Sequence, residues 1–205
     1  MSAGAGAGRP LRLGVFGGTF DPIHNGHLAV AVNARHGVGL DQVLLVVANQ
    51  PWQKADQRVS PAADRLAMVH AAVAGVEGLS ASDVEIRRGG RSYTADTLAE
   101  LAAAHPGAEL FLIVGADVAP ILGSWERVEE VEALATLVVV DRPGAGPAVT
   151  PPGWAQVRTV EVPALDISST DLRARAADGR PLDFLVPPAA IRCIRERGLY
   201  AGGNP

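Results

Sequence analysis

The residues with the clearest chemical potential form one segment, 17–27, which reads Gly-Gly-Thr-Phe-Asp-Pro-Ile-His-Asn-Gly-His. It follows a short apolar run and precedes a helical pattern, so it is predicted to be a strand-to-helix turn. Gly17 and Gly18 lack a Cβ, which allows a tight turn and a close approach to a phosphate. Thr19 and Phe20 would offer backbone N–H groups in the same turn. The segment therefore predicts a nucleotide-phosphate site.

Two histidines add catalytic potential to this turn. His24 and His27 are three residues apart, so they share one side of a first helical turn. Imidazoles can donate to phosphate oxygens, and the helix N-terminus adds partial positive charge. Gly26 between them would leave room for a base or a ribose. The set suits transfer onto the α-phosphate of a nucleoside triphosphate, by positioning and charge stabilisation rather than through a covalent enzyme intermediate.

A second candidate phosphate segment lies near the end of the chain. Ser168, Ser169 and Thr170 stand at a predicted helix start, where hydroxyls and backbone N–H groups are exposed. Arg173 follows one turn later. Together these residues could hold the β- and γ-phosphates and the leaving pyrophosphate. The alternative is that the serines and the threonine merely cap a helix.

The elements that must position these residues alternate between short apolar strands and helices. This alternation predicts an α/β fold, a Rossmann-like, doubly wound parallel sheet with C-terminal helices. In such sheets, ligands bind at the carboxyl ends of the strands, where Gly17-Gly18, 49–54 and 115–117 would meet. The expected strands are 11–16, 42–47, 79–86, 109–114, 136–141 and 157–162. The expected helices are 25–35 closed by Gly37, 60–75 with Ser60 at the cap, 94–104, 126–135, 170–177 and 188–197.

Composition limits the classes of partner. The chain has 205 residues, a net charge of −4 and 48% hydrophobic residues, which predicts a flexible tail over 1–10 and one domain over 11–205. A mildly acidic chain without a basic run is a poor candidate for binding long nucleic acid. No apolar run is long enough for a membrane span. One cysteine, Cys193, gives no sign of an oxidising compartment, so the cytoplasm is expected.

Several motifs together resemble one known family. Segment 17–27 resembles the GGxFxPxHxGH signature of the adenylyltransferases of NAD synthesis, in the HxGH nucleotidyltransferase superfamily, and 167–173 resembles ISSTxxR. Residues 88–97, Arg-Gly-Gly-Arg-Ser-Tyr-Thr-Ala-Asp-Thr, are similar to the nicotinate-receiving segment of bacterial nicotinate-nucleotide adenylyltransferases. Residues 115–117 and 124–126 match as well, and Pro-Trp-Gln-Lys at 51–54 resembles the actinobacterial branch.

The resemblance implies a reaction and a set of site residues. ATP, as its Mg²⁺ complex, and nicotinate mononucleotide would give nicotinate adenine dinucleotide and pyrophosphate, without a dedicated protein ligand set for the metal. A homo-oligomer is compatible with the sequence. The implied catalytic residues are His24, His27 and Arg173. The implied ATP site comprises Gly17, Gly18, Thr19, Phe20, His24, His27, Gly115, Asp117, Ser168, Ser169, Thr170 and Arg173, and the implied mononucleotide site comprises Asn49, Lys54, Thr94, Trp125 and Arg142.

The mononucleotide site carries its own physical expectations. Backbone N–H groups near Thr94 and Trp125 would favour a carboxylate, which only accepts hydrogen bonds. The Trp125 indole would stack on the pyridine ring, or else it is an ordinary core aromatic. Lys54 and Arg142 would contact the mononucleotide phosphate, or else they are surface charges. Two other functions stay open: phosphopantetheine adenylyltransferase, and a nucleotide-binding regulator without catalysis.

Overall fold

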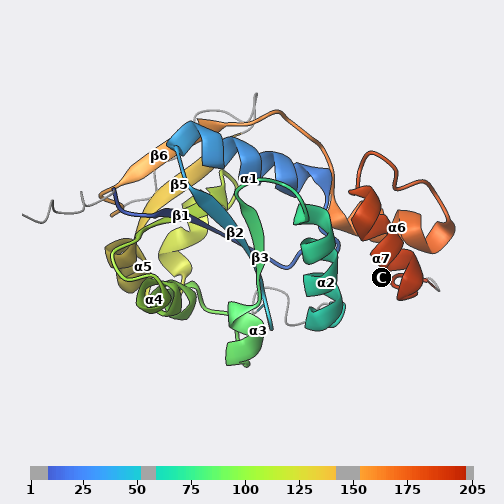
Figure 1. Cartoon of the computed structure of the whole chain (residues 1–205), viewed down its shortest axis with the longest axis horizontal. Helices are drawn as coiled ribbons and strands as arrows, with labels where there is room; N and C mark the ends of the chain where they lie inside the picture. The colour runs from blue at the N-terminus through green and yellow to red at the C-terminus, as the bar shows by residue number, and fades with distance from the viewer. Residues whose placement is uncertain (1–8, 52–58, 142–152, 202–205) are drawn as a thin grey trace, which may run out of the picture.

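A parallel sheet of six strands forms the centre of the molecule (Figure 1). The computed structural model describes residues 9–51, 59–141 and 153–201. Every neighbouring pair of strands in the sheet is parallel, and the strand order is β3-β2-β1-β4-β5-β6. The strands are β1 (Arg12–Gly18), β2 (Gln42–Val47), β3 (Leu79–Ser82), β4 (Glu109–Gly115), β5 (Ala135–Asp141) and β6 (Val157–Glu161).

The central strands are buried on both faces, which explains their nearly continuous runs of Val, Leu and Ile. Val15 of β1 pairs with Leu44 of β2 on one side and with Leu112 of β4 on the other. The direction in which the chain adds strands reverses between β1 and β4. Ligands of doubly wound sheets bind at such a reversal, beyond the carboxyl ends of the strands. The predicted fold class is therefore confirmed.

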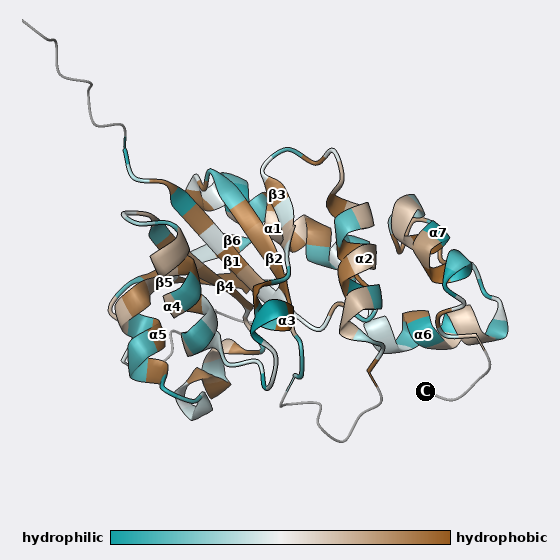
Figure 2. Cartoon of the chain, turned by 60° about the horizontal axis from the view of Figure 1, so that its bottom comes forward, coloured by the Kyte–Doolittle hydropathy of each residue, from teal (hydrophilic) through white to brown (hydrophobic). Residues whose placement is uncertain are grey.

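Helices cover the sheet in two layers, each with its own hydrophobic cluster (Figures 1 and 2). The central strands are largely brown in Figure 2, whereas the helices around them also carry teal positions. α7 packs against α2, so the C-terminal helices extend the first layer. The first layer contains α1 (Asn25–Val38), α2 (Ala62–Val73), α6 (Ser169–Asp178) and α7 (Pro188–Glu196). The second contains α3 (Val84–Arg88), α4 (Thr94–Ala104), the 3₁₀ helix η2 (Ala119–Ser124) and α5 (Val128–Leu134).

Helix α1 is longer than the sequence pattern predicts. It runs through Gly37 to Val38, and Gly39 is the residue that closes it. Gly39 adopts φ +69°, a left-handed conformation that glycine adopts without strain, and its N–H donates to the carbonyls of Arg35 and His36. The prediction that Gly37 closes the helix is therefore wrong.

The predicted strand 79–86 is also only half correct. β3 ends at Ser82, and α3 begins at Val84. Ser82 pairs with Val46, and β2 ends one residue later, so the chain beyond Ser82 has almost no strand left to pair with. The backbone groups of 84–88 are satisfied within a helix instead.

Two helix starts differ from the predictions as well. α2 begins at Ala62 with Pro61 at the cap, and the N–H of Ser60 donates to the Asp21 carboxylate at 3.0 Å. α5 begins only at Val128, since Arg127 before it adopts a left-handed φ of +56°. The predicted helix 126–135 is therefore too long at its start.

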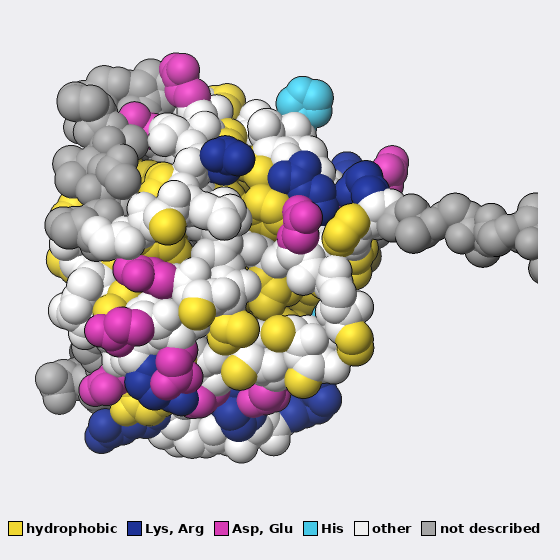
Figure 3. All heavy atoms as spheres, turned by 90° about the vertical axis from the view of Figure 1, so that its left-hand side faces the viewer, with side chains coloured by type: hydrophobic (Ala, Val, Ile, Leu, Met, Phe, Trp, Pro, Cys, Tyr) yellow, Lys and Arg dark blue, Asp and Glu magenta, His cyan; other side chains and the backbone are white. Residues whose placement is uncertain are grey.

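The described surface is mixed in charge on the side drawn in Figure 3, where dark-blue and magenta side chains are interspersed. No helix among the described residues is long and apolar enough to cross a membrane.

Candidate active site

A cavity of about 210 Å³ lies at the carboxyl ends of β1, β2 and β4, where the strand order reverses. Its wall includes six residues that the sequence assigned to the nucleotide sites: Gly17, Gly18, Thr19, Thr94, Gly115 and Trp125. The remaining wall is mostly apolar, with Val, Leu, Ile and Ala side chains from the strand ends. A mostly apolar cavity with a few polar groups suits a flat organic ring.

The two histidines lie together at the start of α1. His24 is the N-cap residue and is buried, and His27 stands three residues into the helix. Their rings stack, with centroids 3.6 Å apart. The His24 N–H donates to Nδ1 of His27 at 3.2 Å, so a neutral His27 ring carries its proton on Nε2.

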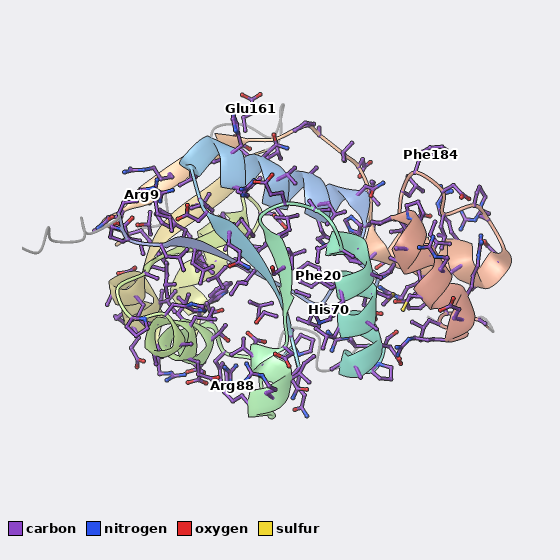
Figure 4. All side chains as sticks on the ribbon, in the orientation of Figure 1. Arg9, Phe20, His70, Arg88, Glu161 and Phe184 are labelled. Carbon is purple, nitrogen blue, oxygen red and sulfur yellow. The ribbon has the colours of Figure 1, made fainter. Side chains whose placement is uncertain are left out.

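Two glycines in this segment make space for neighbouring aromatic rings. A Cβ at Gly18 would lie 2.7 Å from the Phe20 ring, so the glycine is required because Phe20 folds back beneath it. A Cβ at Gly26 would lie 3.0 Å from Nδ1 of His24, so Gly26 makes space for the histidine ring. The Phe20 ring is buried between the sheet and α2 (Figure 4) and meets His27 edge-on, with centroids 5.0 Å apart.

The second phosphate segment packs directly against the first, although the two are far apart in the sequence. The Ser169 hydroxyl donates to the carbonyl of Pro22, 147 residues away, at 3.1 Å. Nη1 of Arg173 donates to the carbonyl of Asp21 at 2.8 Å, and its Nη2 contacts the Thr170 hydroxyl at 3.3 Å. α6 thus begins at the same edge of the sheet as α1, and the N-termini of both helices lie in the same region.

Ser168 does cap this helix, as its alternative interpretation predicted. Its side chain is the N-cap of α6 and accepts from the Thr170 N–H at 3.2 Å. The capping role and a phosphate role are compatible, because the first turn of a helix holds further N–H groups without intrahelical acceptors.

Asp21 connects the phosphate segment to two distant parts of the chain. Its side chain is buried, with 3% of the residue exposed. Oδ1 accepts from the Tyr200 hydroxyl at 2.6 Å, and Oδ2 accepts from the Ser60 N–H at 3.0 Å. Burial, followed by the charge of Asp21, raises the pKa of Tyr200 well above its ordinary value, so the phenol stays protonated as a donor.

Arg65 also stabilises this region, through hydrogen bonds to the backbone. Its guanidinium is almost fully buried and donates to three backbone carbonyls, those of Ser60, Thr19 and Asn49, at 2.8, 2.8 and 3.2 Å. Burial lowers the Arg65 pKa from its ordinary value, while the nearby Asp21 charge opposes that shift. One side chain therefore connects the loop after β1 to the loop after β2.

The residues expected around the mononucleotide are only partly brought together. Thr94 is the first residue of α4 and lines the cavity, so the N–H groups of the first turn lie beside it. The backbone N–H of Trp125 is already bonded to Leu122 at 2.9 Å, so it is not the expected second donor. Its indole Nε1 is instead a buried donor with no acceptor among the described residues, and the side chain lines the cavity.

Other expected residues lie beside the cavity or outside the described residues. Asn49 is not part of its wall, and its side-chain amide donates to the Gly90 carbonyl at 2.9 Å, which holds the loop before α4. Asp117 is exposed just beyond Gly115. Lys54 and Arg142 lie outside the described residues.

The sequence patterns did not single out four buried or half-buried polar residues: Arg65, Glu85, Thr97 and Tyr200. Glu85 was hidden inside the predicted strand 79–86, which received no functional interpretation. Its one available signal was an acidic residue close to a strand end at the ligand edge of the sheet. Arg65 and Tyr200 gave no local signal, because each acts through partners far away in the sequence.

Comparisons with known proteins agree with this architecture. A family model described as cytidylyltransferase-like matches residues 15–175. A relative from Saccharopolyspora erythraea is 47% identical over 194 residues, covering 95% of this chain and 92% of its own, and one from Streptomyces coelicolor is 47% identical over 188 residues, covering 91% and 99%. Each is named a probable nicotinate-nucleotide adenylyltransferase.

A solved structure has the same fold. The nicotinic acid mononucleotide adenylyltransferase of Plasmodium falciparum, complexed with NaAD, aligns with a TM-score of 0.74 at 18% identity, covering 92% of this chain and 97% of that one. With the strand order, the paired phosphate segments and these relatives in agreement, the chain belongs to the cytidylyltransferase-like family and, within it, to the nicotinate-nucleotide adenylyltransferases.

Proposed function

We propose that the protein transfers the adenylyl group of ATP to nicotinate mononucleotide, giving nicotinate adenine dinucleotide and pyrophosphate. The observation that carries this proposal is that the two candidate phosphate segments contact each other beside the cavity. Ser169 donates to the Pro22 carbonyl and Arg173 donates to the Asp21 carbonyl, and the cavity is large enough for an aromatic ring. A triphosphate lying over both helix N-termini would bring its α-phosphorus next to an acceptor held in the cavity.

The chemistry is a displacement at phosphorus. A phosphate oxygen of the mononucleotide attacks the α-phosphorus of ATP, the bond to the β-phosphate oxygen breaks, and pyrophosphate leaves. In the proposed roles, Nε2 of His27 and the His24 ring donate to oxygens of the reacting α-phosphate. The start of α6 and Arg173 hold the β- and γ-phosphates and neutralise the departing pyrophosphate.

The cavity supports an aromatic acid as the acceptor's base. The first turn of α4 presents N–H groups beside Thr94, and Trp125 presents a buried indole N–H. A carboxylate can accept from all of these donors, whereas an amide would turn a donor toward some of them. The Trp125 ring would stack on the pyridine. Lys54, Arg142 and, more indirectly, Asn49 remain the proposed residues around the mononucleotide phosphate.

Magnesium is proposed to enter as part of the substrate MgATP, with its ligands supplied mainly by phosphate oxygens and water. Within the described ranges, no group of three His, Cys, Asp or Glu side chains is arranged to hold a metal ion.

The test is pyrophosphate release by the full chain with ATP and a panel of acceptors: nicotinate mononucleotide, nicotinamide mononucleotide and phosphopantetheine. Nicotinate mononucleotide is expected to give the highest kcat/KM. Preference for phosphopantetheine would contradict the proposed acceptor. ATP binding with no turnover on any acceptor would instead support a nucleotide-binding regulator.

A further inference from the structure

Glu85 is the one ionisable side chain among the described residues that line the cavity. Only 7% of the residue is exposed. Its Oε1 accepts from the Thr97 hydroxyl at 2.7 Å, and its Oε2 is buried with no hydrogen-bond partner among the described residues. Burying a carboxylate without a full set of hydrogen-bond partners raises the free energy of the folded state. Such a group in a cavity wall therefore indicates a functional role.

The nearby cations are engaged elsewhere. Arg88 pairs with Glu100 at 2.8 Å and reaches Glu85 through the Thr97 hydroxyl, to which it donates at 3.2 Å. The guanidinium donors of Arg65 go to backbone carbonyls, and the Glu85 charge acts on Arg65 only at longer range. No ion pair of Glu85 occurs within the part of the chain that the structure describes. Its negative field is therefore available to a ligand in the cavity.

We propose that Glu85 determines specificity by recognising the positive charge of a pyridinium ring bound in the cavity. This inference rests on the proposed function and deepens it. The base of nicotinate mononucleotide is a zwitterion, with a ring nitrogen that carries a positive charge and a carboxylate that carries a negative one. The N-terminus of α4 at Thr94 suits the carboxylate, and Glu85 suits the ring. Trp125 would also favour a positively charged ring, because the face of an indole attracts cationic groups.

The arrangement also explains how one small cavity can accept an anionic substituent while holding a buried anion. Glu85 reaches the cavity from α3, and Thr94 comes from the start of α4. When the ring is bound with its carboxylate toward α4, the carboxylate lies near the positive end of that helix and the positive ring lies near Glu85. The opposite orientation would bring two carboxylates together, so Glu85 also fixes the orientation of the ring.

The decisive experiment compares nicotinate mononucleotide with an isostere in which the ring nitrogen is replaced by carbon, so that the ring is uncharged while the carboxylate and the phosphate are kept. The wild-type full chain is expected to bind the pyridinium compound at least about tenfold more tightly than the isostere, as measured by calorimetry without ATP. In Glu85→Gln, KM for nicotinate mononucleotide should rise about tenfold or more, and the preference over the isostere should shrink to about twofold. Gln keeps the size of the side chain and the acceptor for the Thr97 hydroxyl, so the change removes mainly the charge.

A matched control removes the same charge at an exposed site. Glu129→Gln on α5 should leave both the preference for the cationic ring and the KM for ATP within about twofold of wild type. A Glu85→Gln variant that keeps the full preference would overturn the inference. Equal affinity of the wild-type protein for the two compounds would overturn it too, and that measurement needs no variant to fold. A wild-type protein that turns over another acceptor but not nicotinate mononucleotide would instead refute the proposed function.

Discussion

Replacing Tyr200 by Phe tests whether the C-terminal end of the chain holds the phosphate segment in place. The change removes a single hydroxyl, which donates to Oδ1 of the buried Asp21 at 2.6 Å. The ring itself packs against the first hydrophobic cluster and would stay there. A contact between the same hydroxyl and Sδ of Met68, at 3.9 Å, is long and adds little. The substitution therefore tests mainly the hydrogen bond between Tyr200 and Asp21, which are 179 residues apart.

The size of the effect follows from the charge and burial of the acceptor. A hydrogen bond to a charged group contributes about 1.5–3 kcal/mol. Asp21 retains the Ser60 N–H on its other oxygen, so only part of its solvation is lost. We expect the free energy of unfolding to fall by about 2 kcal/mol. For a chain of this length, that corresponds to a decrease in Tm of about 4–8 °C.

Catalysis should respond as well, because the Asp21 carbonyl also accepts from Arg173. A shift of the segment by a fraction of an ångström would disturb the alignment of the two phosphate segments, so kcat is expected to fall about tenfold. The KM for nicotinate mononucleotide should change little, since Thr94 and Trp125 do not contact Asp21 in any described hydrogen bond.

The assay is urea unfolding followed by circular dichroism, together with initial rates of pyrophosphate release. The chain contains only two tyrosines, and Tyr93→Phe is the matched control. Among the described residues, the Tyr93 hydroxyl has only a long, exposed contact with Arg91 at 3.5 Å, so its loss should change stability by less than about 0.5 kcal/mol. In a double-mutant cycle, Asp21→Ala and Tyr200→Phe should couple by about 1–2 kcal/mol. Additive effects, or a Tyr200→Phe protein as stable as wild type, would show that the hydroxyl does not hold the segment.

Three further outcomes follow from the same geometry. Burial and Asp21 raise the Tyr200 pKa, so the phenol loses its proton near pH 10 in the unfolded chain but keeps it in the folded one. Wild type should therefore lose about 1.4 kcal/mol of stability by pH 11 that Tyr200→Phe does not lose. Equal losses for both proteins in urea titrations at pH 8 and 11 would contradict the raised pKa. His27→Ala should lower kcat by about 10²–10⁴-fold while Tm stays within about 4 °C of wild type, and near-normal turnover would exclude a catalytic role. Trp125→Ala should raise the KM for nicotinate mononucleotide about tenfold and leave the KM for ATP within about twofold, and a larger effect on ATP would argue against stacking on the pyridine.

The local patterns of the sequence were sufficient for the fold class and for the local structure of the two candidate phosphate segments, a strand-to-helix turn and a helix start. Apolar strands such as 109–114 must be buried on both faces, which requires a parallel sheet with helices on each side. Segments 17–27 and 167–173 were legible because a turn after a strand and a cap before a helix depend on neighbouring residues alone. Their proposed chemistry rests on residue type and spacing.

Tertiary structure decided which residues support those segments. The end of β3 depends on where its partner β2 ends, and no pattern within 79–86 contains that information. Asp21 and Tyr200 are partners across nearly the whole chain, and Arg65 reaches Thr19 across 46 residues. Glu85 became visible as a cavity residue only once α3 and α4 were folded together. The physical reason is common to all of these: a buried polar side chain is defined by its partner, and its partner is brought near only by packing of the whole domain.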